Sequence, residues 1–464
     1  MKLPMKSITE AIDKAVRHRN LNCLITETFS LAKKQAEAAE ERGVKPFPVI
    51  VKDCFAVKDV PLTCSSKMLV GYRVPYTATI IERLVDAGGC IIGKSNLDEF
   101  SMGSSSLRGF FGPVKSGFTQ EANVDDDWVI PGGSSGGSAV GVQLGMAKIA
   151  IGSDTGGSTR NPAAFNGVFG FKPTYGLLSR HGMVPLTNSL DAPSIISSSV
   201  KDCKHFFDMM KGRDPCDPTS VSRGRCIPNQ HNSLKGLVIG VPKEYYNEYL
   251  SPVVLRALNS SALKLEKAGC TLKEVSMNFT EQSIVCYHIL GECDIASNMA
   301  RYDGVSYGYR KEGETSSLDA MYTASRSESL NAIVKNRIIA GNYFLLKENR
   351  KKYFDAAVRL RRLIAEDFKR VFSADGEGVH ALLTPVTSDT AHSYKHWKKE
   401  SFQHDWVDDF YTQPANMAGV PAISVPVGMC RRGRPIGVQL ISNLFQDDLC
   451  LHIAENLNRA MCEK

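Results

Sequence analysis

The feature that most restricts the fold of this chain is a glycine- and serine-rich region, residues 131–185, that apolar segments interrupt. Two of these segments lie at residues 146–151 and 167–171. A flexible linker lacks such segments, because it has no surface to bury. The region therefore predicts tight turns gathered around a site, held inside a folded domain.

Strand and helix patterns alternate before this region. Residues 46–51 read PFPVIV, a run too short for a helix, which predicts a buried strand that delivers Lys52 at its end. Residues 79–87 have helical spacing, and residues 90–92 read as a short strand. The alternation indicates an α/β protein.

Further strands are expected late in the chain, at residues 421–427 and 437–441, with another at 237–241. A long charged region at 254–374 reads as helical. Because both ends of the chain supply strands, we predict one domain, 1–464, built on a mixed β-sheet with helices on both faces. Its expected parts are a helical segment at 1–45, a core with the glycine-serine motifs at 46–200, an exposed excursion at 211–236, and a second half at 237–464 that completes the sheet and the substrate pocket.

Composition narrows the class of protein. A hydrophobic content of 43% supports a large core. The 13 cysteines form no C-x-x-C pair, which favours reduced thiols over a disulfide framework. His392 and His396 have ligand-like spacing but lack the adjacent Glu of a zinc protease, so we predict no metal. No apolar run approaches the roughly 20 residues of a membrane span.

The net charge of +7 suits an anionic partner such as RNA, but it is equally common in organellar proteins that bind no nucleic acid. The basic N-terminus fits either an organellar address or an ordinary amphipathic helix. The basic stretch at 347–370 is diluted by acids such as Glu348 and Asp355. We therefore expect a solvated helix face there rather than an RNA-binding stripe.

Two segments carry the chemistry, PGGSSGGS at 131–138 and GSDTGGSTRNP at 152–162. Neither has the Gly-Lys-Ser/Thr of a phosphate-binding loop or the spacing of a dinucleotide fingerprint. Glycines beside a serine let the backbone aim consecutive N–H groups at one point, as an oxyanion hole requires. The candidate donors are the N–H groups of Thr155, Gly156, Gly157 and Ser158.

A serine nucleophile also needs a base. The Gly-x-Ser-x-Gly match at 132–136 lies among turn residues and makes a poor nucleophile elbow. With no histidine partner indicated, Ser-Lys catalysis is the alternative, and Lys52 suits it because burial lowers the pKa of a lysine. Two plainer interpretations stay open at this point, in which Lys52 is a surface-seeking cation at a strand end and the serines only form turns.

Both segments are similar to the motifs of the amidase-signature family, in which GGSSGGS is followed by GSDTGGS and an Arg, here at 132–138 and 152–160. The resemblance implies that the chain hydrolyses an amide bond. It also implies a catalytic unit made of Lys52, Ser134 in a cis peptide bond, and the nucleophile Ser158.

Within this family the chain resembles the A subunits of glutamyl-tRNA(Gln) amidotransferases over nearly its whole length. The matching segments are VKD at 51–53, GKSNLDEFSMGSS at 93–105, FKPTYG at 171–176, SLD at 189–191, RYDG at 301–304 and PAISVP at 421–426. This implies a glutamine pocket with Arg337 on the α-carboxylate, Asp409 on the α-ammonium, and Tyr307 as a third contact. Surface ion pairing is the plainer alternative for Arg337 and Asp409.

The resemblance also implies a complex. Ammonia released from glutamine would pass to a B-type subunit that uses ATP and Mg²⁺ to convert glutamyl-tRNA(Gln) into glutaminyl-tRNA(Gln). This chain is then expected to hold no cofactor, the partner to bind most of the tRNA(Gln), and the complex to have room for a small additional subunit. We expect a mitochondrial matrix location, with the cytoplasm as the alternative.

Two rival functions remain. A stand-alone amidase of the same fold would act on apolar or aryl amides, and the Arg337 and Asp409 pair argues against it. A non-catalytic scaffold would have no use for the complete set of Lys52, Ser134 and Ser158.

Overall fold

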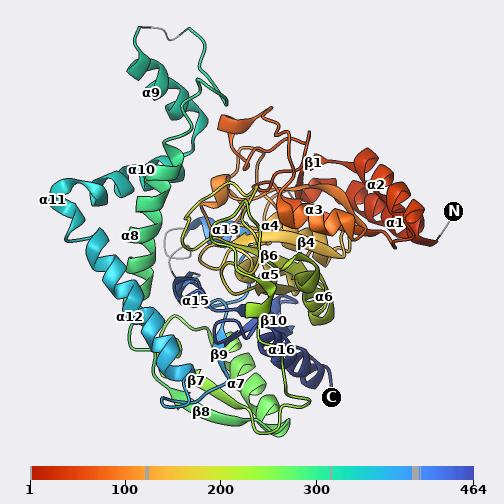
Figure 1. The fold of residues 1–464 in the computed structure, drawn as a ribbon, viewed down its shortest axis with the longest axis vertical. Helices are drawn as coiled ribbons and strands as arrows, with labels where there is room; N and C mark the ends of the chain where they lie inside the picture. Colours follow the sequence, from red (N-terminus) through yellow and green to blue (C-terminus); the bar gives the residue numbers. More distant parts are fainter. Residues whose placement is uncertain (1–2, 121–124, 314–315, 400–406, 408, 464) are drawn as a thin grey trace.

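The computed structural model describes residues 3–120, 125–313, 316–399, 407 and 409–463. Within them one 11-stranded sheet runs in the order β1-β3-β2-β4-β6-β5-β10-β11-β9-β7-β8 (Figure 1). Its strands are β1 (Leu24–Glu27), β2 (Phe47–Lys52), β3 (Gly89–Ser95), β4 (Ile149–Asp154), β5 (Phe169–Lys172), β6 (Ala192–Ser197), β7 (Val238–Pro242), β8 (Thr271–Val275), β9 (Ala381–Pro385), β10 (Ala422–Met429) and β11 (Pro435–Ser442). Both ends of the chain contribute strands, which confirms the predicted single mixed sheet.

Parallel and antiparallel pairing together place the functional residues. Strand β2 pairs in parallel with β3 and with β4, whereas β4, β6, β5, β10, β11 and β9 pair antiparallel in that order. Lys52 ends β2 and Asp154 ends β4. Parallel strands have their carboxyl ends at the same edge of a sheet, where α/β proteins commonly bind ligands. Lys52 and Asp154 therefore reach one edge together.

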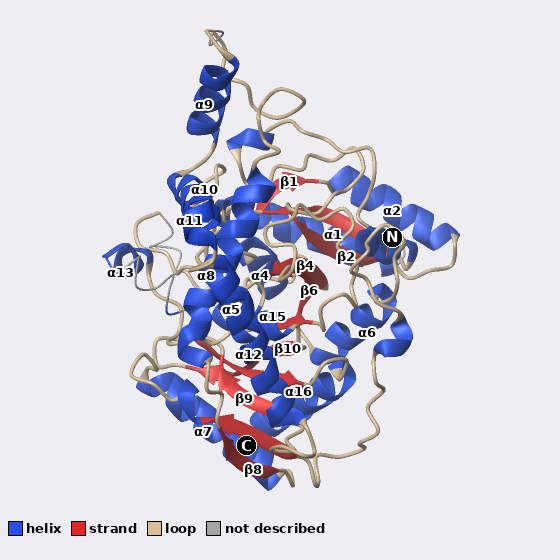
Figure 2. Ribbon diagram, turned by 60° about the vertical axis from the view of Figure 1, so that its left-hand side comes forward, coloured by secondary structure: helices blue, strands red, loops and turns tan. Residues whose placement is uncertain are grey.

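Helices cover both faces of the sheet (Figure 2). They are α1 (Leu3–Arg17), α2 (Phe29–Glu41), α3 (Thr79–Asp86), α4 (Gly136–Gln143), α5 (Arg160–Asn166), α6 (Val200–Met210), α7 (Pro252–Lys267), α8 (Thr280–Met299), α9 (Leu318–Ser329), α10 (Ala332–Leu345), α11 (Lys347–Arg350), α12 (Phe354–Phe372), α13 (Tyr394–Lys399), α15 (Gln413–Ala418) and α16 (Asp447–Cys462).

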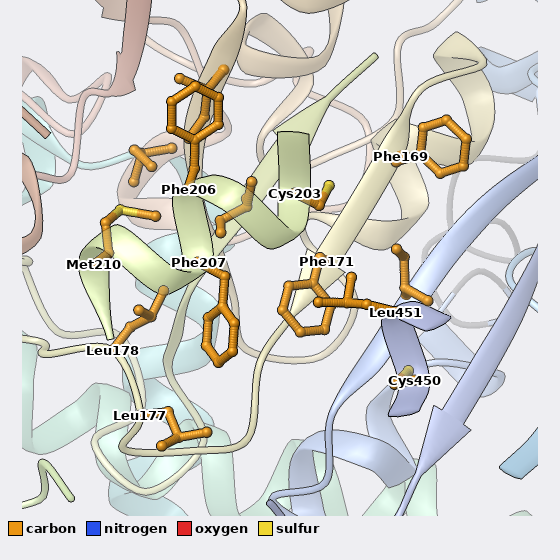
Figure 3. Packing of buried hydrophobic residues seen from close by; sticks show 14 of the residues in the cluster. Phe169, Phe171, Leu177, Leu178, Cys203, Phe206, Phe207, Met210, Cys450 and Leu451 are labelled. Carbon is orange, nitrogen blue, oxygen red and sulfur yellow. The ribbon is translucent and has the colours of Figure 1, made fainter. Parts of the chain in front are cut away.

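Strand β2 shows why its sequence is apolar without alternation. Ile50 belongs to the core formed with α1, α2 and α4, whereas Val49 and Val51 belong to the core formed with α3, α6, α7 and α16. Successive side chains of a strand point to opposite faces, so a strand covered on both faces is apolar throughout. In the second core, Figure 3 shows Phe207 of α6 beside Phe171 of β5, and their ring centroids lie 5.4 Å apart.

The region predicted as wholly helical, residues 254–374, contains the strand β8, so that prediction was wrong there. Strand β8 is at the edge of the sheet beside β7, and its burial is uneven. Its sequence TLKEV therefore lacks the apolar run that marks a strand buried on both faces. The basic stretch at 347–370 also divides, into α11 and α12.

Helices α8 to α12 stand beside the sheet as a helical arm (Figure 1, green to cyan). Helices α8 and α10 approach closely at Gly341, where a Cβ would lie 1.9 Å from the backbone oxygen of Glu292. Any larger residue would push the two helices apart. This contact fixes α10, which carries Arg337, against α8.

Candidate active site

Lys52 and Ser134 form the buried end of the site. Lys52 is fully buried, and its Nζ donates to Ser134 Oγ at 2.7 Å and to Ser153 Oγ at 2.8 Å. Ser134 follows a cis peptide bond after Gly133, as the family resemblance predicted. Ser153 belongs to β4, the neighbour of β2. Ser153 was not predicted from the sequence because its role depends on which two strands are adjacent.

The environment of Lys52 shifts its protonation equilibrium toward the neutral amine. Burial lowers the pKa of Lys52 below that of an ordinary lysine, while the nearby Cys54 and the carboxyls of Asp98 and Asp154 act in the opposite direction. A lysine accepts a proton only in its neutral form, so the lowered pKa increases the fraction of Lys52 that is available as a base near neutral pH.

Ser158 lies in the turn that joins β4 to α5. It is half-buried, whereas Lys52 and Ser134 are fully buried, so Ser158 is the member of the predicted set that a substrate can reach. Its backbone oxygen accepts a hydrogen bond of 3.0 Å from the N–H of Ser135. That bond ties the turn to the segment that carries Ser134, and the structure thus gathers the three predicted residues in one place.

A buried ion pair shapes this turn. Asp154 accepts from the N–H groups of Gly157 at 3.0 Å and Thr159 at 3.2 Å, and Nη2 of Arg160 lies 2.8 Å from its Oδ1. Burial opposes the ionised form of Asp154, but the positive charge and hydrogen bonds of Arg160 outweigh it and lower the pKa of Asp154 to about 2. The carboxylate therefore stays charged and holds the turn at neutral pH.

Gly157 departs from the predicted oxyanion hole. Its N–H is directed at Asp154, so in this structure it does not point toward a substrate. Its φ of +136° and a Cβ position only 2.2 Å from Thr412 Oγ1 instead explain why a glycine stands there. The remaining predicted donors of the oxyanion hole are the N–H groups of Thr155, Gly156 and Ser158.

The charges of Arg337 and Asp409 both influence the pKa of Tyr287 in α8. Burial is the main cause that raises the pKa of Tyr287, the negative charge of Asp409 adds to it, and the positive charge of Arg337 opposes it. The ring of Tyr287 packs on the turn that joins β4 to α5 and carries Ser158, here called the nucleophile turn, because a Cβ on Gly156 would be 2.6 Å from its Cζ. Tyr287 therefore connects the turn with the predicted pair. It was not predicted from the sequence because a buried aromatic residue in a helix resembles any core residue.

Thr412 makes a second connection between the pair and the turn. Its Oγ1 donates to the backbone oxygen of Gly156 at 2.6 Å, and its N–H donates to the backbone oxygen of Asp409 at 3.3 Å. The segment that carries Asp409 is thus hydrogen-bonded to the turn that carries the nucleophile.

Tyr307 has different neighbours. Its ring stacks on Tyr72 with centroids 5.2 Å apart and meets Tyr302 edge-on at 6.1 Å. Its part in substrate binding stays a prediction, and Tyr287 is the phenol whose pKa responds to the charges of Arg337 and Asp409.

Metal binding and membrane insertion have no support in the described residues. The rings of His392 and His396 lie 4.9 Å apart, but no group of three or more His, Cys, Asp or Glu in the described ranges could hold a metal ion. None of the helices in those ranges is both long and apolar enough to cross a bilayer.

Known proteins match this chain along nearly its whole length. A family profile described as Amidase matches residues 6–451. The A subunit of the mitochondrial glutamyl-tRNA(Gln) amidotransferase of Xenopus tropicalis is 45% identical over 460 residues, which cover 94% of this chain and 87% of that protein. The corresponding A subunit of Ixodes scapularis is 46% identical over 450 residues, covering 94% and 88%.

Solved structures agree with the sequence relatives. The glutamyl-tRNA(Gln) amidotransferase A subunit of Thermotoga maritima superposes with a TM-score of 0.73 at 30% identity, covering 98% of this chain and 93% of that one. A crystal structure of an amidase gives 0.79 at 25% identity, covering 99% and 96%. With the family profile, the motifs and the fold in agreement, the chain belongs to the amidase family.

Proposed function

We propose that this chain is the glutamine-hydrolysing A subunit of a glutamyl-tRNA(Gln) amidotransferase. The observation that carries the proposal is geometric: Tyr287 packs on the turn that carries Ser158, and Thr412 hydrogen-bonds that turn to the segment of Asp409. A guanidinium pairs with an α-carboxylate, and a carboxylate accepts from an α-ammonium. The pair therefore suits a free amino acid, and the similarity to amidotransferase A subunits supports glutamine-dependent amide transfer.

The proposed reaction uses one proton path in both directions. The proton of Ser158 Oγ moves to Ser134 Oγ as the proton of Ser134 moves to Lys52 Nζ, and Ser158 Oγ attacks the side-chain amide carbon of glutamine. The N–H groups of Thr155, Gly156 and Ser158 stabilise the oxyanion. The leaving nitrogen recovers a proton along the same path and departs as ammonia, which leaves a glutamyl ester on Ser158. Water then cleaves the ester and releases glutamate.

The ammonia serves a partner. In the proposed complex a B-type subunit binds ATP and Mg²⁺ and most of the tRNA(Gln), and it converts glutamyl-tRNA(Gln) into glutaminyl-tRNA(Gln). Amide hydrolysis by the serines and the lysine needs no cofactor in this chain. The relatives are themselves parts of multi-subunit enzymes, which supports the existence of partner subunits, and a small additional subunit is compatible with this. The animal relatives are named as mitochondrial proteins, which supports a mitochondrial location, and we propose the matrix within it.

The test is ammonia release from glutamine by the purified chain, alone and coexpressed with the B-type subunit, for the native protein and for Ser158→Ala. We expect Ser158→Ala to lower kcat by several orders of magnitude, as loss of a catalytic nucleophile does. We expect the native rate to rise in the complex when glutamyl-tRNA is present. Efficient cleavage of unrelated amides with no action on glutamine would favour the stand-alone amidase, which the similarity to a solved amidase keeps as the second candidate.

A further inference from the structure

The outward face of α10 and its C-terminal end carry exposed apolar side chains at helical spacing. Ile339, Tyr343 and Leu346 are 67%, 48% and 46% exposed. Residues four and three positions apart lie on the same face of a helix, so these side chains form one surface, here called the α10 stripe. A single exposed apolar residue is ordinary, but a contiguous apolar surface marks an interaction site.

Aromatic and basic groups extend the α10 stripe at one end. The ring of Tyr343 lies 5.9 Å from that of Tyr353, and Lys352 Nζ lies 5.1 Å from the centroid of Tyr353. The exposed cations that follow the stripe are Lys347, Arg350, Lys351 and Lys352, with Glu348 as the exposed acid among them. Aromatic and arginine side chains dominate the energetics of protein interfaces, and a cationic rim complements carboxylates on a partner.

A groove adjoins the α10 stripe on its other side. It lies between α8, α9 and α10 and has a volume of about 790 Å³, and its wall combines Tyr322, Leu330 and Ile338 with the charged Asp303, Asp319 and Lys335. Ile339 borders both the groove and the stripe. A partner side chain in this groove would therefore be continuous with contacts along the stripe.

We propose that the α10 stripe and its groove are the docking surface for the B-type subunit, which would present an apolar segment flanked by carboxylates. This rests on the proposed function, because the partner is the other part of that amidotransferase. The apolar side chains of Ile339 and Leu346 favour protein over RNA, since phosphate contacts need cations and would leave the stripe in water.

Docking would also act on the pocket. Arg337 lies in α10 two residues before Ile339, so one helix carries both the predicted carboxylate-binding group and the docking surface. Partner contacts that immobilise α10 would fix the guanidinium for its substrate. We expect the KM for glutamine to be lower in the complex than in the isolated chain.

The test compares Ile339→Asp and Tyr343→Ala with the native full-length chain, using the B-type subunit of the same organism as the probe. We expect each change to raise the dissociation constant about tenfold or more, as at an interface hot spot. Glutamine hydrolysis by the isolated chain should stay unchanged. Leu263→Asp is the matched control, because Leu263 is 55% exposed on α7 and lies outside the α10 stripe. It should keep the native affinity.

The outcomes separate the two proposals. Equal affinities for native, Ile339→Asp and Tyr343→Ala chains would overturn the docking surface and leave the glutaminase function standing. Binding that depends on Ile339 in a chain that releases no ammonia from glutamine would keep the surface and remove the proposed activity. If Ile339→Asp abolished binding of a labelled tRNA(Gln) transcript, or self-association of the chain, with partner affinity unchanged, the surface would belong to that other occupant and the proposal would fail.

Discussion

The catalytic end of the site and the substrate pocket are built differently. Lys52 and Ser134 are completely buried, and their elements, β2 and the segment before α4, lie inside the layered core. Arg337 and Asp409 are half-buried, and Arg337 comes from the helical arm. Lys52 and Ser134 are thus fixed by core packing, whereas Arg337 lies on a helix with exposed apolar surface.

This difference implies a division of labour. A base must keep its distance to one hydroxyl, which a close-packed core provides. A recognition group must admit and release substrate, which requires exposure. Changes in the core should therefore lower kcat, and changes in the arm should raise the KM for glutamine.

The largest expected effect comes from Lys52→Ala. Loss of the terminal base should lower kcat about 10⁴-fold with little change in KM, because members of a catalytic unit fail together. Steady-state kinetics with glutamine measure both values, and Ser138→Ala is the control, a buried serine of α4 whose Oγ lies 2.7 Å from Ser95 Oγ. A variant that kept kcat and raised KM would place Lys52 in the recognition set instead and break the comparison.

Within both ends, the residues that a motif or a family resemblance marks could be predicted from the sequence, and the residues that only the fold brings next to them could not. Lys52, Ser134 and Ser158 were found because contiguous motifs and an apolar strand mark them. Ser153 and Tyr287 were missed, because their roles arise only when β4 lies beside β2 and when α8 lies on the nucleophile turn.

Secondary structure was predictable on the same terms. Apolar runs in the sequence predicted the buried strands β2, β10 and β11, because both faces of these strands are covered. The edge strand β8 has one such face at most, so its mixed sequence was read as part of a helical region. Local sequence patterns thus indicate which segments are buried, whereas the order of the strands in the sheet is known only from the structure.

The second prediction tests whether the core end depends on its ion pair. Asp154→Asn would leave the buried guanidinium of Arg160 without its counter-charge, which should lower the free energy of unfolding by about 3–5 kcal/mol. On the arm, Glu366→Gln removes an exposed partner of Arg362 and should change it by about 0.5 kcal/mol or less. Chemical denaturation of both variants gives the two values. Similar losses of unfolding free energy in the two variants would mean that the buried ion pair of the core and the exposed one of the arm contribute equally to stability.

The same ion pair predicts a pH dependence. The pKa of Asp154 is about 2 in the folded chain, below the roughly 3.9 of an unfolded Asp, so its ionisation stabilises the fold above about pH 4. That contribution disappears as the pH falls from about 4 to about 2. Denaturation of Asp154→Asn should therefore lack this acid-dependent component.

The third prediction concerns the arm. Arg337→Met keeps the length of the side chain and removes its charge, so loss of a charge-assisted hydrogen bond of about 1.5–3 kcal/mol should raise the KM for glutamine roughly tenfold to a hundredfold. We expect kcat to stay within about threefold, and an amide substrate without an α-carboxylate to be cleaved equally by both proteins. Arg359→Met, an exposed arginine of α12, is the control. Equal losses for both substrates would assign Arg337 a structural role.

The smallest expected effect, from Ser153→Ala, examines how the core aims its base. Ser153 Oγ accepts one N–H of Lys52. This hydrogen bond fixes the orientation of the amine, so that Nζ also faces Ser134 Oγ. Without that bond kcat should fall about tenfold with KM unchanged. A hydrogen bond to Lys52 favours the ammonium form more than the neutral form, so its loss should lower the pKa of Lys52 further and move the acid limb of the kcat profile to lower pH. Ser153→Thr restores the hydroxyl and should restore both the rate and the limb. A drop in kcat with an unmoved limb would mean that Ser153 only fills space, and the precision of the core would then come from packing alone.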